Sequence, residues 1–167
     1  MIAKSYILEN LRSLDYRYRK ARSAKEALFC SKLAILELCG WIEESMDDVV
    51  RRCATRHLNE QDNRDFCENQ IIRKNYGFDY HLNFRSMLTR LIGLVAVEKL
   101  EKKVDQNIHV NMTAALSSLK TIRNAAAHTH LKGTARILNA PSVTVGQFHA
   151  LYAGLTELES KIKRIKL

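Results

Sequence analysis

Proline and glycine are scarce in this chain of 167 residues, which has one proline and six glycines. The alternation of apolar and polar residues that is typical of half-buried strands is nearly absent as well. Apolar residues instead recur at helical spacing, so the sequence predicts an all-α fold. We expect a bundle of about five or six helices, and the chain length favours a single domain spanning residues 1–167.

Paired cysteines and long apolar runs are lacking too. The four cysteines show no C-x-x-C pair and no zinc-like spacing with histidine, so we expect reduced thiols, no metal and no cofactor. The N-terminus has no signal-peptide pattern, and no segment approaches the roughly 20 apolar residues of a membrane span. These absences predict a soluble cytoplasmic protein with no membrane partner.

Positive charge is in clear excess, since 27 lysines and arginines face 18 acidic residues and give a formal net charge of +9. Such an excess favours a polyanionic partner, and nucleic acid is the first candidate. A domain with a merely basic surface, or one that faces an acidic partner protein, is the alternative that composition leaves open.

A long central helix is expected to begin at Ser23, because Ser23 and Glu26 form a capping-box pattern. The helix should run past Val50, and residues 33–42 are apolar nearly all round, which predicts burial on several sides. Within that stretch, Gly40 is the position where we expect a close contact between helices.

Four acidic residues follow on this helix, namely Glu43, Glu44, Asp47 and Asp48. They raise the possibility of a metal site. However, Arg51 and Arg52 lie four residues after the two aspartates, which is the favourable order for ion pairs on a helix. We therefore interpret the patch as a solvated, paired face.

The rest of the chain predicts five more helical segments. A first helix, at residues 3–22, precedes the central one. The later segments cover residues 62–74, 82–104, 112–128 and 144–165. The polar stretch of residues 55–80 is either a loop-rich excursion or a partner surface, with a stop signal at residues 75–77. A second capping-box pattern at Thr144 predicts the start of the last helix.

The stretch that carries chemistry is LSSLKTIRNAAAHTHL, residues 116–131. Arg123 offers a planar, permanently charged fork that suits phosphate oxygens, and His128 can transfer a proton near neutral pH. Asn124 can donate and accept hydrogen bonds in fixed geometry. This set suits metal-free RNA cleavage, in which the ribose 2′-OH attacks the adjacent phosphate and leaves a 2′,3′-cyclic phosphate and a 5′-OH.

The spacing of the motif raises a geometric difficulty. On an ideal helix, Arg123 and His128 lie about 140° apart, so they do not share a face. A cleft between two helices, or a twofold dimer with two facing motifs, would bring them together. The structural alternative is that Arg123 pairs with an acid elsewhere and His128 caps the helix.

An R-x4-H motif with a polar residue after the arginine, near the end of a helix, resembles the HEPN superfamily. More narrowly, the chain resembles the RiboL-PSP-HEPN group. The phrases similar to that group are ELCGWIEESMDD (37–48), YGFDYHLNFRSML (76–88), IGLVAVEKLE (92–101) and APSVTVGQFH (140–149). The resemblance covers the chain from about residue 25 to the C-terminus.

The resemblance implies a dimeric helical bundle with a composite active site, acting as a metal-independent endoribonuclease in toxin–antitoxin, phage-defence or RNA-processing systems. It assigns proton transfer to His128, phosphate binding and transition-state charge to Arg123, and positioning to Asn124. Lys120 and His130 are further candidates for contacts to the RNA backbone. An antitoxin or defence protein is a possible partner, beside RNA and a second copy of the chain.

Two other functions compete with this prediction. Some members of the superfamily do not cleave RNA, so a non-catalytic module that binds RNA or docks onto a partner protein is the main alternative. Nucleotide binding or transfer is the other, because the same cleft could hold a phosphate, although no glycine-rich phosphate loop supports it.

Overall fold

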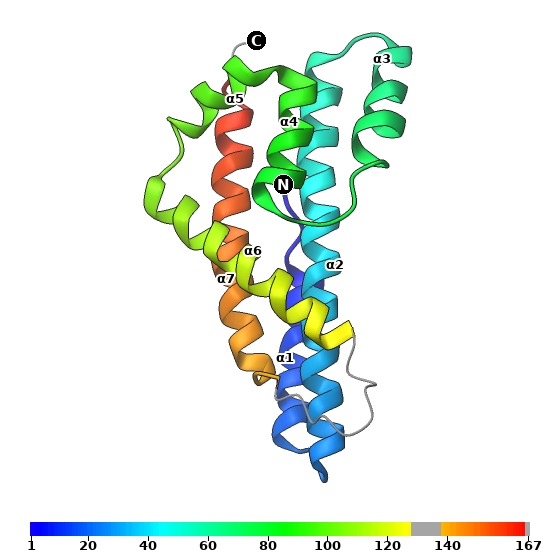
Figure 1. The fold of residues 1–167 in the computed structure, drawn as a ribbon, viewed down its shortest axis with the longest axis vertical. Coiled ribbons are helices and arrows are strands. Elements are labelled where there is room, and N and C mark those ends of the chain that lie inside the picture. The colour runs from blue at the N-terminus through cyan, green and yellow to red at the C-terminus, as the bar shows by residue number, and fades with distance from the viewer. Residues whose placement is uncertain (128–137, 166–167) are drawn as a thin grey trace.

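Helix α2, Ala24–His57, is the element against which most of the others pack, as Figure 1 shows. This computed structural model describes residues 1–127 and 138–165. The described part is all-helical, which confirms the predicted fold class. In chain order its elements are α1 (Ser5–Arg19), α2, α3 (Gln61–Phe66), η1 (Cys67–Ile72), η2 (Tyr80–Phe84), α4 (Arg85–Ile92), α5 (Leu94–Glu101), α6 (Gln106–Ala127) and α7 (Pro141–Ile162), where η denotes a π-helix.

The predicted start of α2 is confirmed by its cap. The Ser23 hydroxyl accepts a hydrogen bond from the Glu26 backbone N–H at 3.2 Å. The return half of the capping box is shifted by one residue, because the Glu26 carboxylate accepts from the N–H of Arg22 at 2.8 Å. A serine and a glutamate at this spacing therefore fixed where the longest helix begins.

The core lies where α1, α2, α6 and α7 meet (Figure 1). Trp41 of α2 packs against Phe148 of α7 with ring centroids 5.0 Å apart, and its indole N–H donates to the Ala3 carbonyl at 2.8 Å. The close contact between helices occurs at Gly154, where an added Cβ would overlap the Met112 side chain of α6. The prediction for Gly40 is wrong, since that glycine is exposed and nothing lies within 4 Å of where its Cβ would be.

The polar stretch at residues 55–80 is an ordered excursion. It contains α3 and η1, which pack beside α2, and η1 ends at Ile72 just before the predicted stop signal at residues 75–77. The turn requires a glycine, because Gly77 has a φ of 113°, in the left-handed region that other residues avoid. The excursion thus returns the chain to the flank of α2, where it lines a pocket.

The single helix predicted over residues 82–104 is wrong. Gly93, with a φ of 82°, separates α4 from α5, so the two segments turn relative to each other. On one continuous helix Val95 would share an apolar face with Leu88, Leu91 and Ile92, but it is 67% exposed, whereas Val97 is buried. Because the backbone breaks at Gly93, residues before and after it no longer share the faces of one continuous helix. The apolar face predicted for a single helix is therefore interrupted.

Helices α6 and α7 both begin earlier than predicted. The Asp105 carboxylate accepts from the N–H groups of Asn107 and Ile108, which starts α6 at Gln106. Helix α7 begins with Pro141 in its first turn, and Thr144 is buried inside it, so the capping box predicted there is wrong. The helical spacing of Leu151, Leu155, Leu158 and Ile162 predicts an apolar side for α7, and all four residues are buried.

All four cysteines are buried and carry free thiols, as expected. Burial raises the pKa of the Cys39 thiol to about 12 and that of the Cys53 thiol to about 11. Across residues 1–127 and 138–165, no helix combines the length and the apolar character that crossing a bilayer requires.

Candidate active site at the end of helix α6

The structure places Arg123 and Asn124 in the last two turns of α6, which crosses the flank of α2 (Figure 1). Arg123 is half-buried and Asn124 is exposed. His128 and His130, the other two predicted site residues of this stretch, lie outside the described residues. The 140° problem between Arg123 and His128 therefore stays open.

Arg123 packs on an aromatic ring and has no acidic partner among the residues described. Its guanidinium carbon lies 5.7 Å from the centroid of the Phe78 ring. Its Nε is buried and finds no hydrogen-bond acceptor within residues 1–127 and 138–165. The alternative in which Arg123 pairs with an acid is thus wrong within this part of the chain. A buried N–H without an acceptor costs free energy, which a bound anion would recover.

A pocket of about 300 Å³ opens beside Arg123. Helix α2 contributes Glu43 and Asp47 to its lining, and the loop after η1 contributes Asn75, Tyr76 and Gly77. Three separate segments therefore line the pocket, and it brings the guanidinium of α6 together with two carboxylates of α2. Asn124 does not line this pocket.

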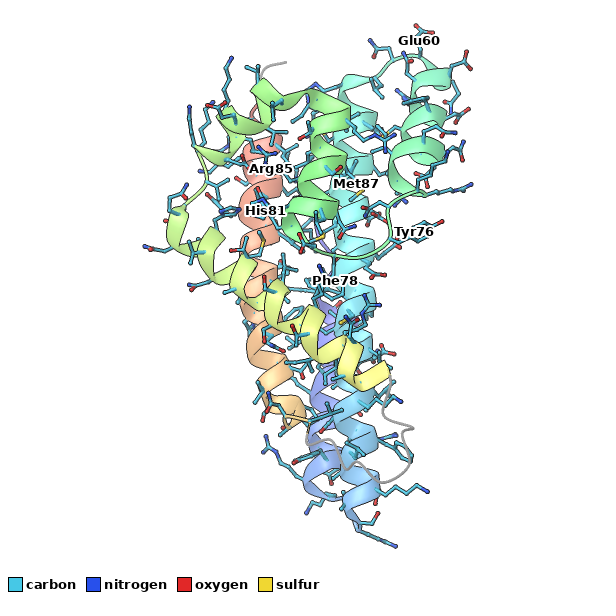
Figure 2. All side chains as sticks on the ribbon, viewed as in Figure 1. Glu60, Tyr76, Phe78, His81, Arg85 and Met87 are labelled. Atoms are coloured by element: carbon cyan, nitrogen blue, oxygen red, sulfur yellow. The ribbon has the colours of Figure 1, made fainter. Side chains whose placement is uncertain are left out.

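The loop that closes the pocket is held by the amide of Asn83. The Asn83 Nδ2 donates to the Asn75 Oδ1 at 2.9 Å and to the Tyr76 carbonyl at 3.1 Å. Its Oδ1 accepts from the Asp79 backbone N–H at 2.8 Å. One side chain of η2 thereby fixes both ends of the turn at Gly77. In Figure 2, Phe78 points toward the bundle while Tyr76 projects away from it.

Asp47 is the carboxyl of the pocket whose pKa is clearly raised. Burial, partly offset by Arg51 and reinforced by the nearby carboxylates of Glu44 and Glu43, raises the pKa of its carboxyl to about 6. Asp47 makes no hydrogen bond or ion pair within the described residues. A carboxyl that titrates near pH 6 can give or take a proton under physiological conditions.

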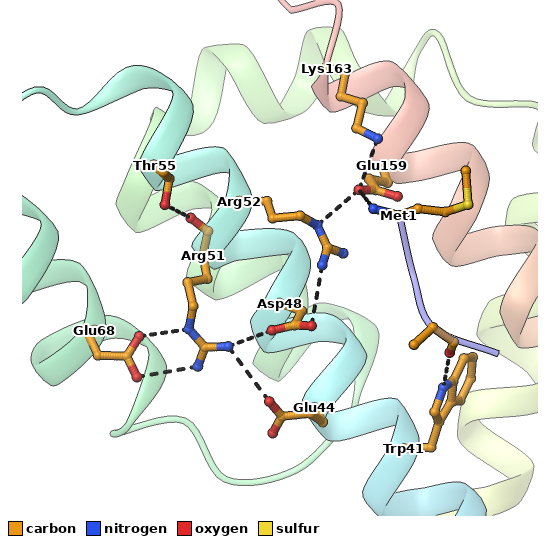
Figure 3. A network of polar contacts seen from close by, with 11 residues as sticks. Met1, Trp41, Glu44, Asp48, Arg51, Arg52, Thr55, Glu68, Glu159 and Lys163 are labelled. Carbon is orange, nitrogen blue, oxygen red and sulfur yellow. Dashed lines mark hydrogen bonds and ion pairs between the residues drawn. The ribbon is translucent and has the colours of Figure 1, made fainter. Parts of the chain in front are cut away.

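The interpretation of the acidic patch as a paired face is half right. Figure 3 shows that Asp48 accepts from Arg51 at 2.6 Å and from Arg52 at 3.3 Å. Glu44 also lies within 3.7 Å of Arg51. Asp47 and Glu43 do not join this network, because they face the pocket. The sequence-based reasoning missed Asp47 since the i, i+4 spacing to an arginine holds for both aspartates.

Lys120, a predicted RNA contact, is engaged by a carboxylate. Its ammonium lies 3.2 Å from Asp79, which also caps η2 by accepting from the N–H groups of His81 and Leu82. The hydrogen bond from the Leu82 N–H lowers the pKa of Asp79 below its ordinary value. Burial raises this pKa in part, and Lys120 lowers it further. Lys120 thus ties α6 to the loop, one turn before Arg123.

The described residues hold no group of three or more histidine, cysteine or acidic side chains that could bind a metal ion. What the arrangement can do is bind an anion at Arg123 and exchange a proton at Asp47.

Comparisons with protein-family models, curated proteins and solved structures found no match to this chain. The resemblance to the HEPN superfamily therefore stays a prediction.

Proposed function

We propose that this protein is a metal-independent endoribonuclease that cleaves RNA by attack of the ribose 2′-OH. The observation that carries the proposal is Arg123, whose guanidinium is half-buried at a pocket and has no acid partner among the described residues. In the surrounding helices the arginines at positions 51, 52 and 85 are each paired with carboxylates. An arginine held unpaired at a pocket is available for a phosphate.

Each step of the proposed reaction needs a particular chemical group. A base removes the 2′-OH proton, and the 2′ oxygen then attacks phosphorus. The 5′ oxygen leaves and takes up a proton, which yields a 2′,3′-cyclic phosphate and a 5′-OH. We assign proton transfer to His128, stabilisation of the phosphorane charge to Arg123 and positioning to Asn124. Asp47, which titrates near pH 6, is our candidate for the second proton transfer.

A homodimer with a composite site is part of the proposal, and an exposed stripe on α2 supports it. Phe29, Leu33 and Leu36 lie at spacings of four and three residues and are 56%, 47% and 37% exposed. The exposed Gly40 extends this stripe toward Glu43 and Asp47 of the pocket. A second copy covering the stripe would bring its own motif close to this pocket.

The biological setting that we propose is a cytoplasmic toxin or phage-defence effector, with an antitoxin or defence protein as its partner. Its family would be the RiboL-PSP-HEPN group of the HEPN superfamily. The support for this setting is the sequence resemblance and the positive net charge of +9.

The experiment is RNA cleavage in EDTA by the wild type, Arg123→Ala, His128→Ala and Arg12→Ala, with analysis of the fragment ends. Arg12, exposed on α1, is the control for loss of one positive charge. We expect the wild type and Arg12→Ala to leave 2′,3′-cyclic phosphate ends and the other two variants to be inactive. Cleavage that persists in both site variants would refute the assignment.

The non-catalytic module is favoured by one specific observation. Glu43 and Asp47 place two carboxylates in the pocket beside Arg123, and their charge opposes a phosphate. Under this alternative, folded wild-type protein binds RNA or a partner without cleaving it, and Arg123→Ala keeps that binding. Measuring binding and cleavage in the same preparations separates the two functions.

A further inference from the structure

Tyr76 stands between two pockets that share it as a wall. On one side lies the pocket of Arg123 and Asp47, and on the other a pocket of about 340 Å³ lined in part by Lys74, Arg90 and Leu82. The Tyr76 side chain is 87% exposed, and Figure 2 shows that it points away from the bundle. A tyrosine this exposed gains almost nothing for the fold.

The two pockets differ in charge. The Arg123 pocket has two carboxylates against one guanidinium, whereas the second pocket has two cations and no acidic residue in its lining. Lys74 and Arg90 are exposed, and neither has an acid partner among the described residues. An RNA strand that places one phosphate at Arg123 needs cations elsewhere to outweigh Glu43 and Asp47, and this second pocket supplies them.

The loop that presents Tyr76 is fixed before any ligand binds. Asn83 holds the turn on both sides of Tyr76 through Asn75 and Asp79, and Asp79 is anchored to α6 by Lys120. A ring on such a loop loses little conformational entropy when a base stacks on it. Leu82, 70% exposed and lining the same pocket, adds apolar surface beside the ring.

We infer that Tyr76, Lys74 and Arg90 form a binding site for single-stranded RNA beside the cleavage pocket. A base stacks on Tyr76, and Lys74 and Arg90 hold phosphates on the side away from Arg123. The inference rests on the proposed function, because RNA is taken as the substrate of the adjacent pocket. Stacking tolerates any base, so this site contributes affinity and register and little sequence specificity.

The test measures binding of a fluorescent 2′-O-methyl oligoribonucleotide by anisotropy, using the full chain. This probe has no 2′-OH and cannot be cleaved by the proposed reaction, so binding is read separately from catalysis. We expect Tyr76→Ala to raise the Kd about ten-fold or more and Tyr76→Phe to stay within about two-fold. Tyr16→Ala, which removes another exposed tyrosine, is the control and should bind like the wild type.

Charge is tested in the same assay by the double variant Lys74→Ala and Arg90→Ala. It should weaken binding and make the slope of log K against log salt concentration shallower by about 1.4, since each of the two lost phosphate contacts contributes about 0.7 on a single strand. Unchanged affinity in Tyr76→Ala, with its fold verified by circular dichroism, would overturn the inference. The loop would then be a candidate surface for binding a protein partner. A wild type that does not bind the probe would overturn it too. Tyr76-dependent binding without RNA cleavage would uphold it and refute the ribonuclease.

Discussion

Asp47 and Asp48 are neighbours on α2 with opposite surroundings. Asp48 lies in a network in which Arg51 also pairs with Glu68 at 3.0 Å and Arg52 also pairs with Glu159 at 3.0 Å (Figure 3). Asp47 points into the Arg123 pocket and has no direct partner in the described part of the chain. One helix therefore carries a paired region, which we call the Arg51–Arg52 network, and an unpaired region, the Arg123 pocket.

The difference shows how charge is used in each region. In the Arg51–Arg52 network, ion pairs join α2 to η1 and α7, so the charges contribute to stability. In the Arg123 pocket, the opposite charges of Arg123 and Asp47 line one space without pairing, which gives up stability that contact would provide. Proteins keep unpaired charged groups of this kind where binding a ligand or catalysing a reaction requires them. We therefore expect variants of the two regions to separate stability from activity.

The largest effect is expected from Arg123→Ala. Cleavage of RNA should fall by about 100-fold or more, because the guanidinium that stabilises the transition-state charge is lost. The free energy of unfolding should change by less than about 1 kcal/mol, since only the stacking on Phe78 is removed. Single-turnover kinetics and urea denaturation measure the two quantities. Arg52→Ala should behave in the opposite way, with lower stability and unchanged cleavage per folded molecule.

Glu159→Ala should cause the largest loss of stability, about 2 to 4 kcal/mol in urea denaturation. Glu159 is buried, and Arg52, Lys163 and the N-terminal amino group surround its carboxylate. The control is Glu157→Ala on the same helix, which breaks an i, i+4 pair with Lys161 and a 3.4 Å hydrogen bond from the Asp105 N–H, and should cost about 1 kcal/mol. Equal losses in both variants would contradict the role given to the network.

The pH dependence of Glu159 follows from the same contacts. Burial alone would raise the pKa of its carboxyl, but Lys163, Arg52 and the N-terminal amino group lower it below the ordinary value. The stabilisation is therefore present above the ordinary glutamate pKa of about 4.3 and is lost as the pH falls through the lowered value. The difference in stability between the wild type and Glu159→Gln should shrink at such acidic pH.

The contribution of Asp47 to stability depends on pH in the opposite direction. Its pKa is about 6 in the folded protein against an ordinary value of 3.8, so the folded state keeps a proton that the unfolded chain releases between these values. Wild-type stability should fall as the pH rises through this window. Asp47→Asn cannot ionise, and it should be about 1 to 2 kcal/mol more stable than the wild type at pH 8 but not at pH 4. Urea denaturation at both pH values measures this difference.

The smallest effect is expected from Lys120→Ala. Its ammonium is held by Asp79, so removing it should cost about 0.5 kcal/mol of stability and change RNA affinity less than about three-fold. Anisotropy with the 2′-O-methyl probe gives the affinity. A loss as large as that of Tyr76→Ala would move Lys120 into the RNA-binding surface.

Local patterns predicted the parts of the fold that local contacts determine. The start of α2 at Ser23 and the buried side of α7 follow from a cap and a helical repeat within the segment itself. The helix break at Gly93 was harder to predict, because an isolated glycine is compatible with a continuous helix. Only the packing of α4 and α5 decides whether the helix breaks there. Thr144 resembled a cap but became part of the core, since Pro141 had already started the helix.

The site required contacts between distant segments, which spacing cannot supply. The sequence predicts that Arg123 binds phosphate, but it could not indicate Phe78, Asp47 or Tyr76 around it. The two aspartates of α2 have the same spacing to an arginine. Glu159, from the other end of the chain, pairs with Arg52, and Glu68 of η1 pairs with Arg51. Only the tertiary structure therefore distinguishes the paired carboxylate from the unpaired one.

The most direct test compares Asp47→Asn with Asp48→Asn, two isosteric changes at adjacent positions. Unfolding free energy at pH 8 and RNA cleavage in EDTA are measured for both. We expect Asp47→Asn to be more stable than the wild type and to cleave about ten-fold more slowly or worse. Asp48→Asn should lose about 1 kcal/mol and cleave at the wild-type rate per folded molecule. Parallel changes in the two variants, in stability and in cleavage, would contradict the division into a structural network and a reactive pocket.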